Sequence, residues 1–385
     1  MLGDALTTFF AGVALAGCAY YVLVLLAARQ FLRRRRGPDS QVGNVPAISV
    51  LKPLAGDEPG LAENLDSFFR LDYPHYEALF AARDELDPAL AIARAARTAY
   101  PELEAHVLVA GESDHPNAKV HSLAAMTAAA GGELLVVSDS DIRADPSLLR
   151  DLARDFEDPK VGVVTCPYRA VPGPSLWSTL EALGMNTEFW SGVLVAQFLA
   201  PMDFAVGPTM AVRRSCLHAI GGWGAFRDYL AEDFQVGRQA RLAGYEVRLS
   251  THVVEHRIGS QPLRENLVHR LRWRRSTRRS RPVGYWGEIF ANPLPWALLL
   301  PIAASGAAWS WAALGTCLVL RSLAALLVGG SILRDAQALP RYWMLPLQDV
   351  LSLLVWTAGL VGKRIVWRGQ TYELARDGRL RTGKD

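Results

Sequence analysis

The stretch Val136–Leu149, VVSDSDIRADPSLL, decides the expected fold, because an apolar run ends in two aspartates and a helix start follows. Asp139 and Asp141 are one residue apart on a predicted turn. Carboxylates held this close repel each other by up to a few kcal/mol at protein-like dielectric, so we expect a cation between them. The alternative is that one of them caps the helix, but Asp145, just before Pro146, has the better cap position.

Short apolar runs alternate with helical stretches on both sides of this motif. The expected strands are 48–51, 76–82, 106–110 and 134–137, and the expected helices are 61–69, 89–100 and 119–130. Apolar strands separated by helices predict βαβ units and a mainly parallel sheet. Ligands bind at the carboxyl ends of strands in such sheets, and the acidic clusters follow two of these ends.

Each acidic cluster has a possible ligand. Asp139 and Asp141 offer the carboxylate oxygens that Mg²⁺ or Mn²⁺ prefers when it also binds a diphosphate. The turn ARDELDP, with Asp84 and Asp87, can accept hydrogen bonds from a nucleobase or a ribose, although solvated loop charges would look the same.

Two further motifs carry charge. LAEDF contains Glu232 and Asp233, where a carboxylate could act as a general base or only supply negative charge at a helix start. The stretch 266–282, NLVHRLRWRRSTRRSRP, surrounds Trp273 with arginines. These arginines would form a basic collar at a lipid surface or hold a phosphate leaving group.

The composition predicts a membrane protein. Half of the 385 residues are hydrophobic, and Ala5–Ala28 contains 24 residues without a charge, enough to span a bilayer. Arginines follow this run at positions 29 and 33–36, the reverse of the order in a cleaved signal peptide. We therefore expect a permanent anchor with its N-terminus outside and the following residues in the cytoplasm.

A second apolar block lies near the C-terminus. The uncharged runs Ile289–Leu320 and Ser322–Leu333 predict a helical hairpin whose second arm contains Arg321. An arginine at that depth is costly and is often functional, unless a shift in register brings it to the interface. Tyr342–Gly362 contains Pro346, Gln348 and Asp349, which favours a re-entrant or interfacial segment over a span.

Charge and cysteine content exclude other classes. The net charge is only +3, which argues against a nucleic-acid binder. The four cysteines are scattered without metal-ligand spacing, as expected for buried thiols in a reducing compartment. A non-enzymatic membrane scaffold would lack the acidic motifs, all of which are present.

The order of these motifs resembles the ceramide glucosyltransferase family, whose members are membrane-bound inverting GT-A glycosyltransferases. The resemblance covers nearly the whole chain. It rests on SVLKPLAGDEPGLAENLDSF, RDELDPAL, PNAKVHSL, VSDSDIRADP, GPTMAVRR, GGWGAFRDYLAEDF, HRLRW and WRG. It implies an α/β, Rossmann-like domain with a mainly parallel sheet in the cytoplasm, and transmembrane helices at both ends of the chain.

The resemblance also implies a role for each matching residue. Asp84 and Asp87 would bind uridine, Lys119 the nucleotide region, Asp139 and Asp141 the metal and diphosphate, and Asp233 would be the catalytic base. Arg272 and Trp273 match the RW pair of a motif written (Q/R)xxRW, which binds substrate. The chain departs from this motif at His269, which titrates near neutrality, so we expect a pH-dependent contribution there.

The expected reaction is sugar transfer, with glucose favoured, from a UDP-sugar to the primary hydroxyl of a ceramide-like membrane lipid, with inversion and with Mg²⁺ or Mn²⁺. Transfer of N-acetylglucosamine to a hopanoid, as in a bacterial branch with similar motifs, and a polysaccharide synthase are the alternatives. The expected location is the bacterial inner membrane. The expected segments are an anchor with its basic flank (1–36), a cytoplasmic glycosyltransferase domain (37–285), a membrane region (286–366) and a cytoplasmic tail (367–385). The oligomeric state stays open.

Overall fold

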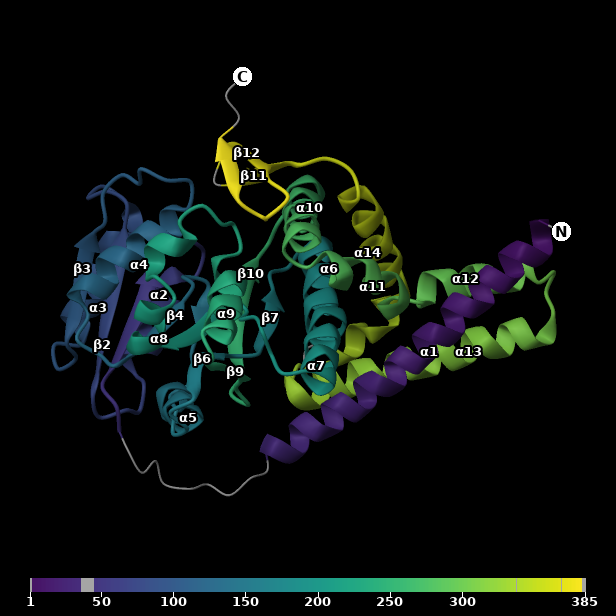
Figure 1. Cartoon of the computed structure of the whole chain (residues 1–385), viewed down its shortest axis with the longest axis horizontal. Helices are drawn as coiled ribbons and strands as arrows, with labels where there is room; N and C mark the ends of the chain where they lie inside the picture. Colours follow the sequence, from purple (N-terminus) through teal and green to yellow (C-terminus); the bar gives the residue numbers. More distant parts are fainter. Residues whose placement is uncertain (1, 36–44, 337, 368, 383–385) are drawn as a thin grey trace. The chain divides into compact units, whose positions relative to one another are not determined.

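The computed structural model describes residues 2–35, 45–336, 338–367 and 369–382, and these form two compact units (Figure 1). The helical unit contains the N-terminal helix, Pro172–Ala200 and Ser260–Thr371. The sheet unit contains 45–171, Pro201–Gly259 and 372–382. The expected boundary at residues 36 and 37 lies outside the described residues.

The sheet unit is built on a seven-stranded sheet in the order β3-β2-β1-β4-β8-β6-β9. Its strands are β1 (Ile48–Pro53), β2 (Tyr76–Ala82), β3 (Ala105–Val109), β4 (Leu134–Ser138), β6 (Val161–Thr165), β8 (Thr209–Arg213) and β9 (Glu246–Leu249). The pairs from β3 to β4 are parallel, as is β6 with β9, and only β8 runs antiparallel to its neighbours. The predicted mainly parallel sheet is therefore confirmed.

Burial on both faces explains why these segments form strands. All residues of β1, β4 and β6 are buried, as expected for strands covered by helices on both faces. The helices α2 (Leu61–Phe69), α3 (Pro88–Ala99) and α4 (Ala118–Ala129) lie within one residue of their predicted positions. Leu65 and Phe69 of α2 and Leu90 of α3 share a core cluster with Phe80 of β2.

A small second sheet supports the DSD turn. Its order is β5-β10-β7, with β5 (Ile142–Arg143), β7 (Tyr168–Pro172) and β10 (Val254–Gly259). The remaining helices of the sheet unit are α5 (Leu148–Asp155), α8 (Arg214–Ala219), η2 (Trp223–Phe226) and α9 (Glu232–Leu242). Because β5 follows Asp141 directly and pairs with β10, a segment more than a hundred residues later is held beside the turn.

The helical unit is assembled from three separate parts of the chain. Its elements are α1 (Leu2–Arg35), α6 (Leu176–Gly184), η1 (Met185–Phe189), α7 (Trp190–Leu199), α10 (Leu263–Ser280), α11 (Pro282–Ala291), α12 (Leu294–Ala303), α13 (Ala308–Ala325), η3 (Leu326–Ile332), η4 (Leu339–Met344), α14 (Leu345–Gly359) and β11 (Arg364–Trp367). Figure 1 shows α12 and α13 lying along α1.

Two helices are long and apolar enough to cross a membrane, Gly3–Arg35 and Ala308–Ile332, among the residues described. The expected hairpin forms between α12 and α13, which pack against each other, and its second arm contains Arg321 as expected. The first apolar run breaks at 304–307, where Ser305 and Gly306 have positive φ angles of 52° and 77°, and α13 continues through Arg321 into η3.

The expectation of transmembrane helices at both ends of the chain is corrected, because the second helix that could span a membrane does not lie at the C-terminus. The second apolar helix ends at Ile332 and is followed by α14, which has 15 residues, fewer than the roughly 20 needed for a span. The expected tail contains two further strands, β12 (Gln370–Leu374) and β13 (Leu380–Thr382), which pair antiparallel.

Candidate active site

The acidic motifs of the sheet unit meet at one edge of the large sheet. β1, β2 and β4 are parallel, so the segments that follow Pro53, Ala82 and Ser138 lie at their common carboxyl edge. β8 is antiparallel and begins where β4 ends, with Thr209 opposite Ser138. The loop before β8 therefore reaches the same edge as the DSD turn.

Asp139 is held by two lysines. Its carboxylate Oδ1 is 2.6 Å from Lys119 Nζ, and its backbone carbonyl accepts a hydrogen bond of 2.7 Å from Lys52 Nζ. The Lys52 ammonium is fully buried and lies 3.8 Å from the centroid of the Phe68 ring. Burial lowers the pKa of Lys52 to about 7, against the attraction of the two DSD carboxylates. Lys52 therefore fixes the backbone of the DSD turn through the Asp139 carbonyl.

Asp141 keeps an oxygen available for a cation. Its Oδ2 is 2.9 Å from His256 Nε2 on β10, whereas its Oδ1 is buried and has no hydrogen-bond partner among the described residues. Burial acts to raise the pKa of Asp141, but His256 lowers it overall. The half-buried Glu58 has a raised pKa, caused by its burial and by the nearby Asp141, and its Oε2 is also unpartnered.

These residues fit a divalent cation. An unpartnered carboxylate oxygen beside a second carboxylate offers the oxygen donors that Mg²⁺ or Mn²⁺ prefers. Asp139 and Asp141 would hold the cation, His256 orients the Asp141 carboxylate, and Glu58 adds negative charge nearby. A bound cation would relieve the repulsion that raises the pKa of Glu58.

The predicted base, Asp233, follows Glu232, which Lys119 links to the DSD turn. Asp233, in the first turn of α9, is only 9% exposed, and its burial, together with the charge of Glu232, raises its pKa to about 7. A side chain at Gly207 would place its Cβ 2.8 Å from Asp233 Oδ2, so only glycine fits there. Lys119 bridges Asp139 to Glu232, its Nζ lying 2.8 Å from Glu232 Oε1.

The first acidic turn has local roles. Asp87 caps α3, because its Oδ1 accepts hydrogen bonds from the backbone N–H groups of Ala89 and Gly56. Asp84 accepts one from Leu86 N and is half exposed. Both lie in the turn at the carboxyl edge of the sheet, and their contact with a nucleotide stays a prediction.

The residues of the RW motif belong to the helical unit. His269 Nδ1 is 2.8 Å from the buried carboxylate of Glu181, and Trp273 Nε1 donates a 3.0 Å hydrogen bond to His269 Nε2. The His269 ring therefore joins the Glu181 carboxylate to the Trp273 indole. The Arg272 guanidinium lies 6.0 Å from the centroid of the Trp273 ring.

Several arginines of the basic stretch have structural partners within the helical unit. Arg275 and Arg278 donate to carbonyl groups at the C-terminal end of α14 and just beyond, including those of Val361 and Gly362. Arg274 pairs with Glu188 and Glu288. These contacts explain part of the arginine content without lipid or phosphate.

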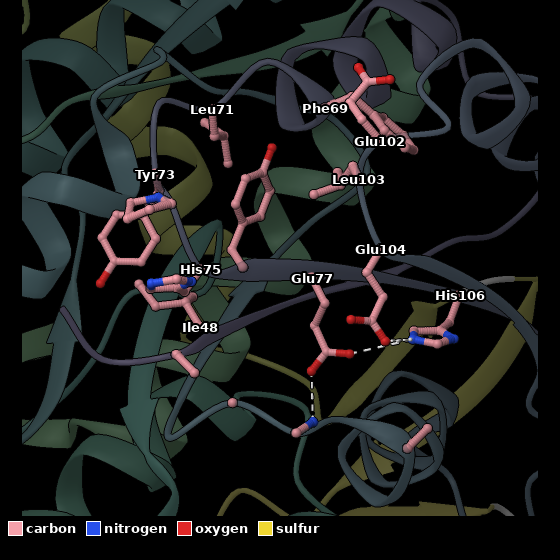
Figure 2. Close-up of a pocket in the computed structure, with 16 residues that line it drawn as sticks. Ile48, Phe69, Leu71, Tyr73, His75, Glu77, Glu102, Leu103, Glu104 and His106 are labelled. Carbon is pink, nitrogen blue, oxygen red and sulfur yellow. Dashed lines mark hydrogen bonds and ion pairs between the residues drawn. The ribbon is translucent and has the colours of Figure 1, made fainter.

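A cavity in the sheet unit lies away from this site. A cavity of about 770 Å³ lies at the amino ends of β1 and β2, lined by residues that include Tyr73, His75, Glu77 and His106 (Figure 2). Its Glu77 is engaged by Ser49 Oγ and Gly131 N, each at 2.6 Å. Because the DSD turn follows the opposite, carboxyl ends of the strands, the cavity is a separate feature.

Sequence reasoning missed Lys52, Glu58, Glu232 as a partner of Lys119, and His256. For Lys52 and Glu58 a signal existed, since both lie directly after a predicted strand, in KPLAGDE. His256 had no local signal, because its place beside Asp141 depends on the pairing of β5 with β10.

Comparisons with known proteins show which sequences and folds this chain is similar to. The model of glycosyl transferase family 21 matches residues 9–380. Ceramide glucosyltransferase 1 of Caenorhabditis elegans is 28% identical over 249 residues, which are 63% of this chain and 53% of that protein. An N-acetylglucosaminyltransferase of Rhizobium leguminosarum bv. viciae is 24% identical over 291 residues, 70% of this chain and 67% of that protein. The chain thus spans about half the length of the ceramide glucosyltransferases of C. elegans that it matches.

Among solved structures, a mannosyltransferase from Pyrobaculum calidifontis, in complex with GDP-Man and Mn²⁺, superposes with a TM-score of 0.54 at 19% identity. The match covers 91% of this chain and 99% of that chain. The fold is therefore an α/β, GT-A-like fold with a mixed, mostly parallel sheet.

Proposed function

Because the chain belongs to glycosyl transferase family 21, as the order of its motifs predicted, we propose that it transfers a sugar from a UDP-sugar to the primary hydroxyl of a membrane lipid. We favour glucose as the sugar and a ceramide-like lipid as the acceptor, by analogy with the curated relatives. The product would be a β-glycolipid.

The observation that carries the proposal is the pairing of two kinds of carboxyl at one edge of the sheet. Asp139 and Asp141 lie on the DSD turn, and Asp141 keeps an unpartnered oxygen. Asp233 is buried and has a pKa raised to about 7, which suits a general base at neutral pH. The chain Asp139–Lys119–Glu232 links the two parts through ion pairs of 2.6 and 2.8 Å.

The donor would lie along the carboxyl ends of β1, β2 and β4. Asp84 and Asp87 would contact the uridine, and Lys119 would lie near the diphosphate, where its ammonium favours negative charge. A divalent cation at Asp139 and Asp141 would neutralise charge as UDP leaves. His269, Arg272 and Trp273 would bind substrate through the helical unit.

The chemical step is one displacement. The Asp233 carboxylate accepts the proton of the lipid hydroxyl, whose oxygen forms a bond to the anomeric carbon. The bond from that carbon to the phosphate oxygen breaks, and UDP leaves with the electron pair. Attack from the face opposite UDP converts an α-linked donor into a β-glycoside.

A second candidate is transfer of N-acetylglucosamine to a hopanoid. It is favoured by the match with the Rhizobium N-acetylglucosaminyltransferase, which covers more of this chain than the match with ceramide glucosyltransferase 1 of C. elegans. A polysaccharide synthase is disfavoured, because such enzymes need more spanning helices to line a channel than the two in the described residues.

The test is to incubate purified protein with UDP-glucose, UDP-galactose and UDP-N-acetylglucosamine, each with ceramide, diacylglycerol and a hopanoid in the presence of Mn²⁺, and to identify products by mass. Asp233→Asn should abolish transfer and leave UDP binding intact. Turnover retained by this variant would remove Asp233 from the role of base.

A further inference from the structure

The C-terminal residues 371–382, TYELARDGRLRT, fold as a hairpin that belongs to the sheet unit from Tyr372 onwards. β12 and β13 pair antiparallel, with Leu374 opposite Leu380. The turn between them has Asp377 accepting a hydrogen bond from Arg379 N and Gly378 at a φ of 86°. An Asp-Gly turn between alternating apolar residues is a strong hairpin signal.

This hairpin contacts the loop that leads into α9. Arg379 forms a β-bridge with Tyr229, and the N–H of Leu380 donates a 2.6 Å hydrogen bond to the Asp228 carbonyl. The Arg379 guanidinium lies 5.3 Å from the centroid of the Tyr229 ring, and its Nε donates to the Tyr229 hydroxyl at 3.2 Å. The loop thus receives backbone and side-chain contacts from the end of the chain.

The other side of the same loop is held by Asn117, which is fully buried. Its Nδ2 donates a 2.7 Å hydrogen bond to the Tyr229 carbonyl, and its backbone N–H donates to the Arg227 carbonyl at 3.1 Å. Asn117 also caps α4, so it fixes the start of the helix that carries Lys119.

Residues 227–231 form the loop that connects η2 to α9, the helix that carries Asp233. Glu232 and Asp233 begin α9 three and four residues after Tyr229, without a side-chain cap at Ala231. The first turn of α9 is held directly by Lys119 and Asn117, which both contact Glu232, and in addition by contacts of the residues just before it. Asn117 supplies the inner contacts and the hairpin supplies the outer ones.

We propose that the C-terminal hairpin is a positioning element for the catalytic base, in which Arg379 and Leu380 hold Tyr229 and Asp228 and so fix the first turn of α9. The inference rests on the proposed role of Asp233. Arg379 touches no reacting group and acts through the loop. Its side chain is 54% exposed, so its replacement removes the ring contact and the hydrogen bond to the Tyr229 hydroxyl without opening the core, and leaves the backbone contacts in place.

The test compares three variants of the full-length protein. Arg379→Ala should lower kcat about fivefold, equivalent to about 1 kcal/mol, the size of an exposed cation–π contact, with the KM for the nucleotide sugar changed less than about twofold. Arg379→Lys keeps a cation and a donor and should recover most of kcat. Arg376→Ala, an exposed arginine in the same turn, is the matched control and should behave like the unmodified protein.

Hydrogen–deuterium exchange supplies a readout that needs no turnover. Amides of residues 227–232 should exchange faster in Arg379→Ala and not in Arg376→Ala, because the side-chain contacts between Arg379 and Tyr229 are lost. Unchanged exchange, or faster exchange with an unchanged kcat, overturns the inference. Absence of transfer with every donor would instead contradict the proposed function, and unchanged exchange would still refute the hairpin's hold on the loop.

Discussion

Asp233 is placed where its own charge is disfavoured. It is buried beside Glu232, and an aspartate in such surroundings binds a proton more tightly than in water. A general base has to be deprotonated before it can accept the proton of a hydroxyl. In its proposed role as base, Asp233 with a raised pKa would set the pH range of the chemical step.

We expect kcat to rise with pH and to level off above about pH 7, because the fraction of deprotonated Asp233 rises through that value. The measurement is a pH profile of kcat at saturating donor, with UDP binding followed in parallel. A profile already level well below neutrality would show that Asp233 ionises normally, in conflict with its burial.

His256 gives a second prediction at this scale. It orients the Asp141 carboxylate through a hydrogen bond, so His256→Ala and Asp141→Ala should each weaken Mn²⁺-dependent binding of UDP, by about tenfold or more. Calorimetric titration of UDP at several Mn²⁺ concentrations measures this dependence. His106→Ala, at the opposite end of the strands, is the control. Equal cation dependence in all variants would reject the donor set.

The sequence predicted some of these residues and missed others for a physical reason. Asp139 and Asp141 stand out because a buried strand ends in two carboxylates. His256 does not, because nothing near it in the sequence indicates that β10 pairs with β5. Asp87 shows the opposite case. Its position just before Pro88 is explained by its capping of α3, which needs no ligand.

At the scale of elements, α13 shows how a charge is accommodated in an apolar helix. The Arg321 guanidinium makes two 2.8–2.9 Å hydrogen bonds to the Asp349 carboxylate on α14, and Nη2 also donates to Thr187 Oγ1. Arg321 and Asp349 are almost completely buried. Because Asp349 and Thr187 accept hydrogen bonds from the guanidinium, α13 continues through Arg321.

Removing one partner of this pair should be costly. Arg321→Leu should destabilise the protein by about 3 kcal/mol, because it leaves the Asp349 carboxylate buried and unpaired. The double variant Arg321→Leu/Asp349→Leu should recover much of that loss. Thermal unfolding in detergent measures both, with Arg341→Leu on the exposed face of η4 as control. A double variant no better than the single one would contradict this account.

The break between α12 and α13 was visible in the sequence but was not used. Ser305 and Gly306 are turn residues, and Gly306 adopts a φ of 77° that favours glycine. Counting uncharged residues from Ile289 to Leu320 ignored them. The length of an apolar run therefore failed to predict where the helices end.

At the scale of the whole molecule, the two units do not follow the order of the sequence. The helical unit combines α1 with two later segments, Pro172–Ala200 and Ser260–Thr371. The residues from Tyr372 onwards belong to the sheet unit again. Periodicity gave the strands and helices of the first hundred residues of the sheet unit closely, since each has its own apolar pattern. The exchange of segments depends on packing between distant residues, which no local pattern records.

The two long apolar helices carry their charges at matching ends. Thr7 of α1 donates to the Ala303 carbonyl just before α13, and Arg35 donates to the Ile332 carbonyl at the end of η3, so the two helices run parallel. Arg33 and Arg34 end α1, and Arg334 follows η3. Because basic flanks stay in the cytoplasm, both helices are proposed to run from outside to inside, with α11 and the short apolar helix α12 returning the chain to the outside before α13.

This topology predicts which positions a membrane-impermeant maleimide reaches in intact cells. Cysteines introduced as Gly3→Cys and Ser305→Cys should be labelled from outside, since the start of α1 and the break before α13 lie at the same ends of parallel helices. Ser113→Cys, in the sheet unit, should be labelled only after permeabilisation. The unmodified protein, whose four cysteines are not exposed, is the control. Labelling of Ser113→Cys in intact cells would place the candidate active site outside and remove it from a cytoplasmic pool of UDP-sugar.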